Sequence, residues 1–317
     1  MTKSILVLLG FVFVAQQSWG ALTRWSVAPG DRVQLSVGRA NVQVQRANEN
    51  THVNLQTSGG CREIQSETAA GRLDLREAER FKLRSDSDVC TIQLLVPAAQ
   101  SVSVHVLEGA LSAQKLSGDV LLHLQKGNLI LRDGSGGAQV HVQKGNVLIQ
   151  DYNGRVRMDV LQAPVQLKNL QGDLDMQALA GEHVIEKSKG NFKVTQAQGS
   201  VKIVGGSGVL QFESNRAALT TDLFSGRIEG QSQEGAVNLK LAAESDVNLK
   251  TQAGRVTVQA PAGASLNLAT QEGDLIVPSY MSVARTGAAK SVRGRLRGEG
   301  GKASVMVRSQ EGSIFIK

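Results

Sequence analysis

The chain has 317 residues, including 34 glycines but only 5 prolines, and aromatic residues make up 3% of it. No long segment repeats its apolar residues at helical spacing, so the sequence excludes an α/β enzyme architecture and favours an all-β fold. The formal net charge of +7 is concentrated near the carboxyl end, where residues 285–317 hold eight basic residues and two acidic ones.

Residues 1–20 have the pattern of a secretory signal peptide. A positive charge at Lys3 precedes the apolar run 5–15, and small residues follow at Ser18 and Gly20. We therefore expect export across the inner membrane, to the periplasm or the cell surface. No later segment contains the ~18 consecutive apolar residues that a membrane helix needs, so we expect no transmembrane segment after cleavage.

Residues 21–108 contain short segments in which apolar and polar residues alternate, as around Val33 and Leu35. Alternation at period two is typical of strands with one buried face. This part also holds both cysteines of the chain, Cys61 and Cys90. Since neither stands in a C-x-x-C motif or beside a histidine, we expect a structural disulfide, worth about 2–4 kcal/mol, within an N-terminal β cap.

Residues 109–277 contain a nine-residue repeat that begins with a small residue. Typical units are GDVLLHLQK, GNLILRDGS and GNVLIQDYN. Small residues recur at positions 109, 118, 127, 136, 145, 154, 163, 172, 181, 190, 199, 208, 217, 226 and 235, and then at 254, 263 and 273. The small residue permits a tight turn, and the apolar third and fifth positions, such as Val120 and Leu122, indicate a short strand.

A longer period of 18 residues is also present. His105, His123 and His141 are spaced by 18, as are Lys126 and Lys144 in two copies of the segment QKGN. We infer that one coil consists of two nine-residue half-turns and that equivalent residues of successive coils stack about 4.8 Å apart. The predicted fold is a single-chain β-solenoid (β-helix), preceded by the N-terminal β cap.

Residues 278–317 are expected to form a basic loop followed by two closing strands at 303–316. The loop contains Arg293, Arg295 and Arg297, which could contact an anionic component of the cell envelope. The alternative is a solvated end cap whose charges have no specific partner.

The run CTIQLLVPAAQSVSVHVLEGALSAQKLSGDVLLHLQKGNLIL, the many later G-[DN]-[VL] strands and the closing EGSIFIK resemble the bacterial putative-adhesin family of β-strand-repeat domains. The resemblance covers about residues 25–317, and residues 92–109 are its most specific part. It implies a β-solenoid in the cell envelope and no established activity, so it favours the predicted fold and leaves the ligand open.

Four polar residues at 18-residue spacing, His105, His123, His141 and Asp159, should form one outward row across successive coils. Neighbouring imidazoles about 4.8 Å apart could share a zinc, nickel or copper ion. The alternative is a solvated row of stacked side chains, because a straight ladder lacks the convergent geometry of metal sites. We expect no calcium ladder, since the sixth position of the repeat lacks a regular aspartate.

Candidate catalytic residues are few. Asp173 and Asp175, with Lys168 expected one face of the coil away, are the nearest approach to the acid–base cluster of a polysaccharide-cleaving β-helix enzyme. The motifs G-x-S-x-G, H-E-x-x-H and G-x-x-x-x-G-K-[ST] do not occur in the sequence. We therefore expect neither enzymatic activity nor a cofactor. We also expect no nucleic-acid binding, because the basic end lacks interleaved aromatic residues.

These features predict a non-enzymatic exported protein with a structural, adhesin-like or scaffold role in the cell envelope. The expected partner is an envelope component, whether a protein, a glycan or an anionic surface. Open sheet edges at the ends of the rod would also allow end-to-end self-association. The alternatives are a polysaccharide-acting enzyme and metal binding by the histidine row.

Overall fold

The computed structural model describes residues 22–49, 51–78, 89–98, 100–299 and 301–317. These residues form 22 β-strands and no helix, which confirms the all-β class. Within the described part of the chain, nothing resembles a long apolar helix that could cross a membrane. The predicted signal peptide, residues 1–20, lies outside the described residues.

The strands fall into three groups along the chain. The N-terminal group contains β1 (Thr23–Ser26), β2 (Arg32–Arg46), β3 (His52–Gly59), β4 (Ile64–Ala69), β5 (Arg72–Glu77) and β6 (Cys90–Val96). The central group contains β7 (Ser101–Gln114), β8 (Val120–Arg132), β9 (Ser135–Gln150), β10 (Asn153–Gln162), β11 (Val165–Lys168), β12 (Leu174–Glu186), β13 (Lys189–Val204), β14 (Ser207–Ser232) and β15 (Val237–Thr251). The C-terminal group contains β16 (Val256–Gln259), β17 (Ser265–Thr270), β18 (Leu275–Ile276), β19 (Ala284–Thr286), β20 (Ala289–Arg295), β21 (Ser304–Ser309) and β22 (Ile314–Ile316).

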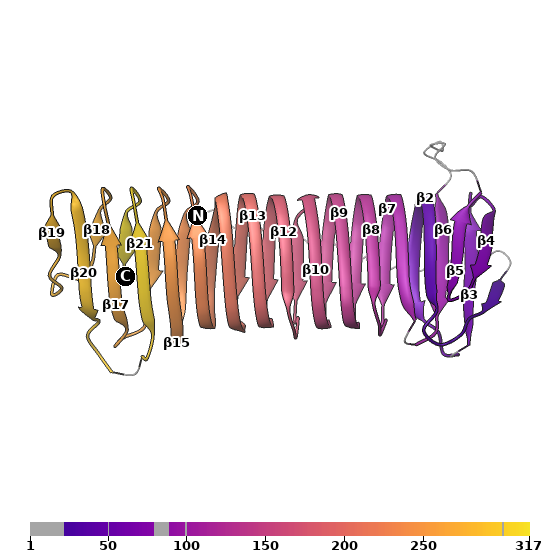
Figure 1. Ribbon diagram of the computed structural model, residues 1–317, viewed down its shortest axis with the longest axis horizontal. Coiled ribbons are helices and arrows are strands. Elements are labelled where there is room, and N and C mark those ends of the chain that lie inside the picture. The colour runs from indigo at the N-terminus through magenta and orange to yellow at the C-terminus, as the bar shows by residue number, and fades with distance from the viewer. Residues whose placement is uncertain (1–21, 50, 79–88, 99, 300) are drawn as a thin grey trace, which may run out of the picture.

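The central strands pair in parallel, each residue with the one 18 positions further along the chain. Val120 of β8 pairs with Val102 of β7 and with Ala138 of β9, and the same shift continues to β14. The predicted 18-residue period is therefore confirmed. Between β14 and β15 the register changes, so that Gly226 pairs with Ser245. Figure 1 shows the strands standing side by side along the length of a rod.

Each coil contributes to two rows of strands. Row A consists of the segments in register with residues 120–124, and row B of those in register with 129–132. Alternate side chains of both rows point into the space between them. Val120, Leu122 and Leu131 are at most 2% exposed, so the predicted apolar third and fifth positions do form the core.

Small residues begin the repeat because successive coils approach closely at this corner. Gly127 has a φ of +140°, and a Cβ there would lie 1.7 Å from the carbonyl oxygen of Gly109 in the preceding coil. At a second corner of the coil, the backbone leaves room for side chains. Asp133, Asp151 and Asn169 adopt positive φ there, and the Asn169 Nδ2 group donates a hydrogen bond of 2.7 Å to Asp151 Oδ1.

The interior of row A changes from apolar to polar toward the carboxyl end. Leu124 of β8 points into the core, and in the carboxyl-terminal strands the equivalent inward position holds a buried hydroxyl residue. Each of these residues begins a turn with the sequence pattern [ST]-Q-[AE]-G. They are Ser232, Thr251, Thr270 and Ser309. Ser232 Oγ donates to the Gly235 carbonyl at 3.2 Å, and Thr251 Oγ1 donates to Ser309 Oγ at 3.0 Å. The hydroxyl groups thus satisfy polar atoms that the turns bring into the core.

At both ends of the rod, the order of strands in space departs from their order in the sequence. β2 pairs with β5 and β6 on one side and with β7 on the other. Similarly, β21 pairs with both β15 and β17, and β22 pairs with both β16 and β18. Figure 1 shows indigo β2 beside magenta β7, and yellow β21 between β15 and β17.

Two expectations about the carboxyl end require correction. The strands expected at 303–316 do form, but they lie inside the stack rather than at its end. Residues 278–302, expected to form a loop, contain β19 and β20, and β20 pairs antiparallel with β17. The segment AKSVRGR of β20 has Val292 as its one large apolar residue, so it shows no clear period-two pattern.

Cys61 and Cys90 form the predicted disulfide, with an S–S distance of 2.07 Å and a Cα–Cα distance of 4.4 Å. Cys90 begins β6, which pairs antiparallel with β3 so that Gly59 lies opposite Cys90. The bond therefore joins the segment that follows β3 to the strand beside it, at the amino-terminal end of the rod.

Candidate functional site

The predicted histidine row exists on the outer side of row A. His105, His123, His141 and Asp159 belong to β7, β8, β9 and β10, and each is in register with the next. Ser36 of β2 is in register with His105 and extends the row by one strand. The spacing of 18 residues was sufficient to predict this row.

The first two histidine rings are stacked on one another, and the third is tilted by 47° from the second. The ring centroids of His105 and His123 are 4.3 Å apart with an interplanar angle of 15°, and those of His123 and His141 are 6.0 Å apart. His141 Nδ1 lies 2.9 Å from Asp159 Oδ2. Burial lowers the pKa of His105, and burial together with its two histidine neighbours lowers the pKa of His123. The row therefore favours neutral imidazoles at these two positions.

The geometry gives no support to the metal-binding alternative. Among the residues that the structure describes, no group of three or more His, Cys, Asp or Glu side chains is placed to hold a metal ion. The stacked rings of His105 and His123 bring their faces together, whereas a metal ion needs ring nitrogens that converge on one point.

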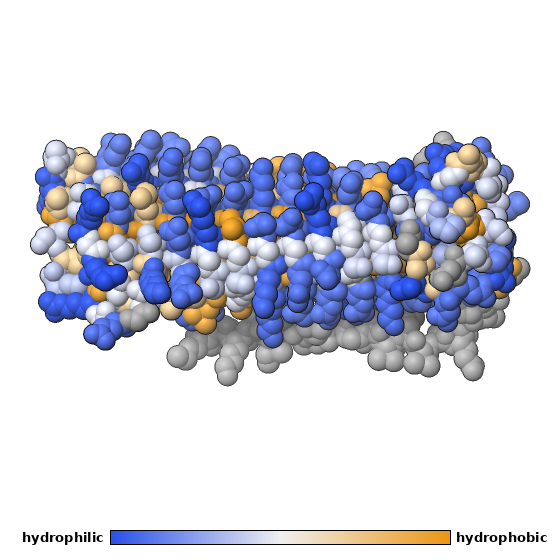
Figure 2. Space-filling model, turned by 60° about the horizontal axis from the view of Figure 1, so that its bottom comes forward, coloured by the Kyte–Doolittle hydropathy of each residue, from blue (hydrophilic) through white to orange (hydrophobic). Residues whose placement is uncertain are grey.

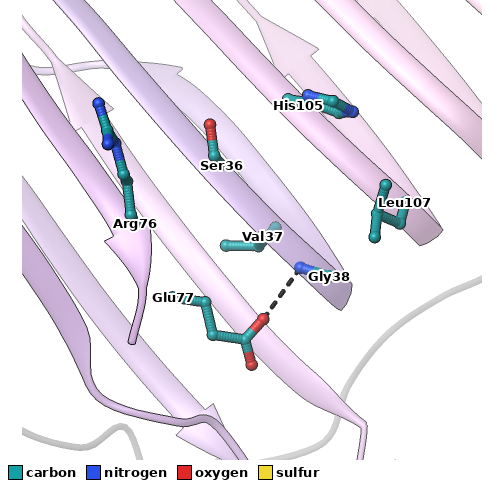
Figure 3. Close-up of a pocket in the computed structure, with 7 residues that line it drawn as sticks. All are labelled: Ser36, Val37, Gly38, Arg76, Glu77, His105 and Leu107. Carbon is teal, nitrogen blue, oxygen red and sulfur yellow. Dashed lines mark hydrogen bonds between the residues drawn. The ribbon is translucent and has the colours of Figure 1, made fainter. Parts of the chain in front are cut away.

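A hollow of about 240 Å³ lies at the amino-terminal end of the histidine row. Figure 3 shows the residues that line it: Ser36, Val37, Gly38, Arg76, Glu77, His105 and Leu107. The hollow lies over Gly38, which has no side chain and whose N–H donates a hydrogen bond of 2.9 Å to Glu77 Oε2. Arg76 also has a partner, since its guanidinium lies 3.1 Å from the buried carboxylate of Asp74. The hollow thus presents imidazole, carboxylate and guanidinium groups, of which the two charged ones already have partners.

The candidate catalytic residues are only partly brought together. Asp173 and Asp175 line a second hollow, of about 380 Å³, on the outer side of row A. Asp173 accepts a hydrogen bond of 2.9 Å from Asn191 Nδ2 and lies 3.5 Å from Arg155. Lys168 lies in row B, where its Nζ is 3.5 Å from Glu186. The aspartates therefore share a hollow, but Lys168 does not join them.

The three arginines near the carboxyl end lie in β20 or directly after it. Arg293 and Arg295 are exposed on the outer side of β20, opposite Asn267 and Ser265 of β17. The Arg297 guanidinium lies 4.3 Å from the ring centroid of Tyr280, and its backbone N–H donates a hydrogen bond of 3.1 Å to the Tyr280 hydroxyl. Arg293 and Arg295 thus lie on a strand rather than in a loop, whereas Arg297 lies in the segment that follows it.

Two further basic residues belong to this surface and were not predicted. Because β21 lies against β15, Arg308 is in register with Lys250, and both side chains are exposed. The sequence contains a signal for this pairing, since VNLKTQAG (247–254) and VMVRSQEG (305–312) align residue for residue.

Three of the solved structures that resemble the chain come from Parabacteroides. A "putative lipid binding protein" from Parabacteroides distasonis is 10% identical, with 94% of this chain and 97% of that chain covered and a TM-score of 0.35. A "putative adhesin" from the same organism is 12% identical, with 95% and 98% covered and a TM-score of 0.32. A "putative adhesin" from Parabacteroides merdae is 12% identical, with 73% and 95% covered and a TM-score of 0.29.

Among curated proteins, no sequence matches this one. The sequence pattern of the Toastrack DUF4097 family, by contrast, matches residues 31–317, which is nearly the whole chain. The matched range includes both ends of the stack, from β2 to β22. The chain therefore belongs to the Toastrack DUF4097 family.

Proposed function

We propose that this protein is an exported, non-enzymatic β-solenoid that serves as a rigid, adhesin-like scaffold in the cell envelope. The proposal depends on one observation, the unbroken 18-residue register from β7 to β14, which repeats the same outward positions on one strand after another. Figure 2 shows hydrophilic side chains in rows across neighbouring strands. Regular surfaces of this kind suit an extended partner.

The location in the envelope is part of the same proposal. The pattern of residues 1–20 is that of an export signal, and the Cys61–Cys90 disulfide fits an oxidising compartment, either the periplasm or the cell surface. In this scheme residues 21–108 cap one end, residues 109–277 present the repeated surface, and the basic segment 278–317 ends the rod.

The first test is retention of the purified chain, from residue 21 onward, on membrane vesicles, peptidoglycan and surface polysaccharide at low and high salt. We expect retention on one fraction without release of soluble fragments. A basic globular protein of similar pI is the control for nonspecific adsorption. Retention on none of the fractions would contradict the scaffold role.

The same assay separates the scaffold from the enzyme alternative. Release of oligosaccharides from the polysaccharide fraction, abolished by Asp173→Asn together with Asp175→Asn, would overturn the non-enzymatic proposal. We expect no release from either the wild-type or the double variant, because Arg155 and Asn191 already hold Asp173 and Lys168 lies in row B, apart from both aspartates.

A further inference from the structure

At the carboxyl end of the rod, the outward side chains of row A are mostly basic or neutral. Lys250 and Arg308 lie on the neighbouring strands β15 and β21, and β20 adds Arg293 and Arg295 beyond β17. We call these four residues the basic face. Among the outward residues of β17, β20, β21 and 246–250 of β15, all of which the structure describes, Asp246 is the only acidic one.

The charges of the basic face have no ion-pair partner among the residues that the structure describes. Within the described part of the chain, no carboxylate oxygen lies within 4.0 Å of the Lys250, Arg293, Arg295 or Arg308 nitrogens. Three lysines elsewhere on the rod are paired across neighbouring coils: Lys126–Glu108 at 2.8 Å, Lys168–Glu186 at 3.5 Å and Lys240–Asp222 at 2.9 Å. The basic face therefore gathers four cations without such a partner on neighbouring strands, with Asp246 as the one acidic residue among the described outward residues of those strands.

The groups between the cations are neutral and form hydrogen bonds. Asn267 and Ser265 lie directly opposite Arg293 and Arg295, and Ser304 lies in register with Ser265. Amides and hydroxyls both donate to and accept from sugar hydroxyls. Guanidinium groups bind carboxylate, sulfate or phosphate through two parallel hydrogen bonds. The face thus combines groups for an anion with groups for a hydroxyl-rich backbone.

The spacing of the cations indicates an extended ligand. They stand on β15, β21 and β20, with β17 between the last two, so they are distributed along the long axis of the rod. Neighbouring strands are about 4.8 Å apart, which separates the outermost cations by roughly three strand spacings. A single small anion cannot span this distance, whereas a polymer with repeated charges can.

We infer that the basic face binds an acidic polysaccharide chain that lies along the rod. This inference rests on the proposed scaffold function and specifies its partner. An anionic membrane fits less well, because Met306 is the one large apolar side chain among the outward residues of these strands, and peripheral membrane binding gains strength from buried apolar area.

The test measures binding of the chain from residue 21 onward to polygalacturonate and dextran sulfate, with neutral dextran as the uncharged control. We expect salt-sensitive binding to both acidic polymers and none to dextran. The triple variant Arg293→Gln, Arg295→Gln and Arg308→Gln should bind about ten- to hundredfold more weakly, because each exposed charge contact contributes up to several-fold.

The matched control is the triple variant Lys126→Gln, Lys168→Gln and Lys240→Gln. It also removes three positive charges, but from outward lysines that are paired with carboxylates, and should weaken binding by less than about threefold. Equal weakening by both triple variants would overturn the inference, because net charge alone would then explain the binding. All six side chains point away from the core, so circular dichroism should show both variants folded.

Two further outcomes separate the inference from the proposed function. Binding to vesicles of equimolar phosphatidylcholine and phosphatidylglycerol, without binding to either acidic polymer, would replace the polysaccharide with a membrane. If an envelope fraction retains the wild-type chain and the basic-face variant equally, the inference fails while the scaffold role stands. Retention of neither protein would contradict both.

Discussion

At the residue scale, the core of row B contains a histidine where neighbouring coils have valine. His183 of β12 is in register with Val165 and Val201 and is 1% exposed. Neither of its buried ring nitrogens has a hydrogen-bond partner among the described residues. Burial disfavours the charged imidazolium and lowers the pKa of His183 to about 4.

This burial predicts a specific loss of stability in acid. In the unfolded chain a histidine has a pKa of ~6.5, so between that pH and about 4 the unfolded state binds a proton that the native state does not. The free energy of unfolding should therefore fall with pH over this range, by about 3 kcal/mol from His183 alone. Below about pH 4 this contribution should stop changing.

His183→Val should remove this part of the pH dependence. At pH 7 we expect a change within about 1 kcal/mol, because the removal of unsatisfied polar atoms and the loss of volume offset each other. Urea unfolding from pH 7 to pH 4 measures the difference, with the half-exposed His123→Gln as comparison. Parallel pH profiles for wild type and His183→Val would contradict the prediction.

A second residue-scale prediction concerns the close corner of the coil. Gly127→Ala should destabilise the protein by about 3 kcal/mol or more, because the new Cβ would overlap the Gly109 carbonyl oxygen. Gly205→Asn is the matched control, since Gly205 also has positive φ, has no atom within 4 Å of a Cβ position and is equivalent to Asn169. Thermal unfolding should separate the two variants clearly, and similar losses would contradict the close approach as the reason for glycine at position 127.

At the scale of elements, β21 and β22 lie inside the stack of strands. They therefore join β15 and β16 on one side to β17 and β18 on the other. Their removal would leave β17 and β18 without their parallel partners, and would expose one side of β15 and β16, which keep their pairing with β14 and with β15 respectively. Removal of a strand at the end of a stack would expose only one neighbouring strand. A truncation should therefore disturb strands on both sides if β21 and β22 lie inside the stack, but on one side only if they lie at its end.

Deletion of residues 303–317 should lower hydrogen-exchange protection in both β15 (246–251) and β17, because each loses one of its two neighbouring strands and keeps β14 or β20 on the other side. Arg285→Pro in β19 is the control, since β19 pairs only with β20 and a proline at a sheet edge removes few hydrogen bonds. Unchanged exchange rates in β15 after the deletion would contradict the position of β21 between β15 and β17.

At the scale of the whole molecule, each coil contacts mainly its immediate neighbours, so stability is local. Cys61→Ser together with Cys90→Ser should destabilise the amino-terminal end by about 2–4 kcal/mol. Exchange in β3 and β6 should become faster, while β12 and β13 stay protected, because neither contacts the disulfide. Equal acceleration in all four strands would instead indicate one cooperative unit.

The sequence by itself determined the features that repeat locally. Glycine every nine residues, alternating apolar positions and histidines 18 apart specify the strand, the coil and the histidine row, because each feature reflects a fixed geometric period. The disulfide was also predictable, since the chain has only two cysteines. Family membership agrees with the resemblance of the repeats to adhesin-like β-strand domains.

Only the tertiary structure decided which strands meet where the period is broken. Backbone hydrogen bonds are the same for any two strands, so a periodic pattern does not specify that β2 enters beside β7 or that β21 enters between β15 and β17. The hollow over Gly38 and the pairing of Lys250 with Arg308 both depend on these non-consecutive contacts. His183 likewise looked like an ordinary polar residue, until its place opposite Val165 and Val201 put it in the core.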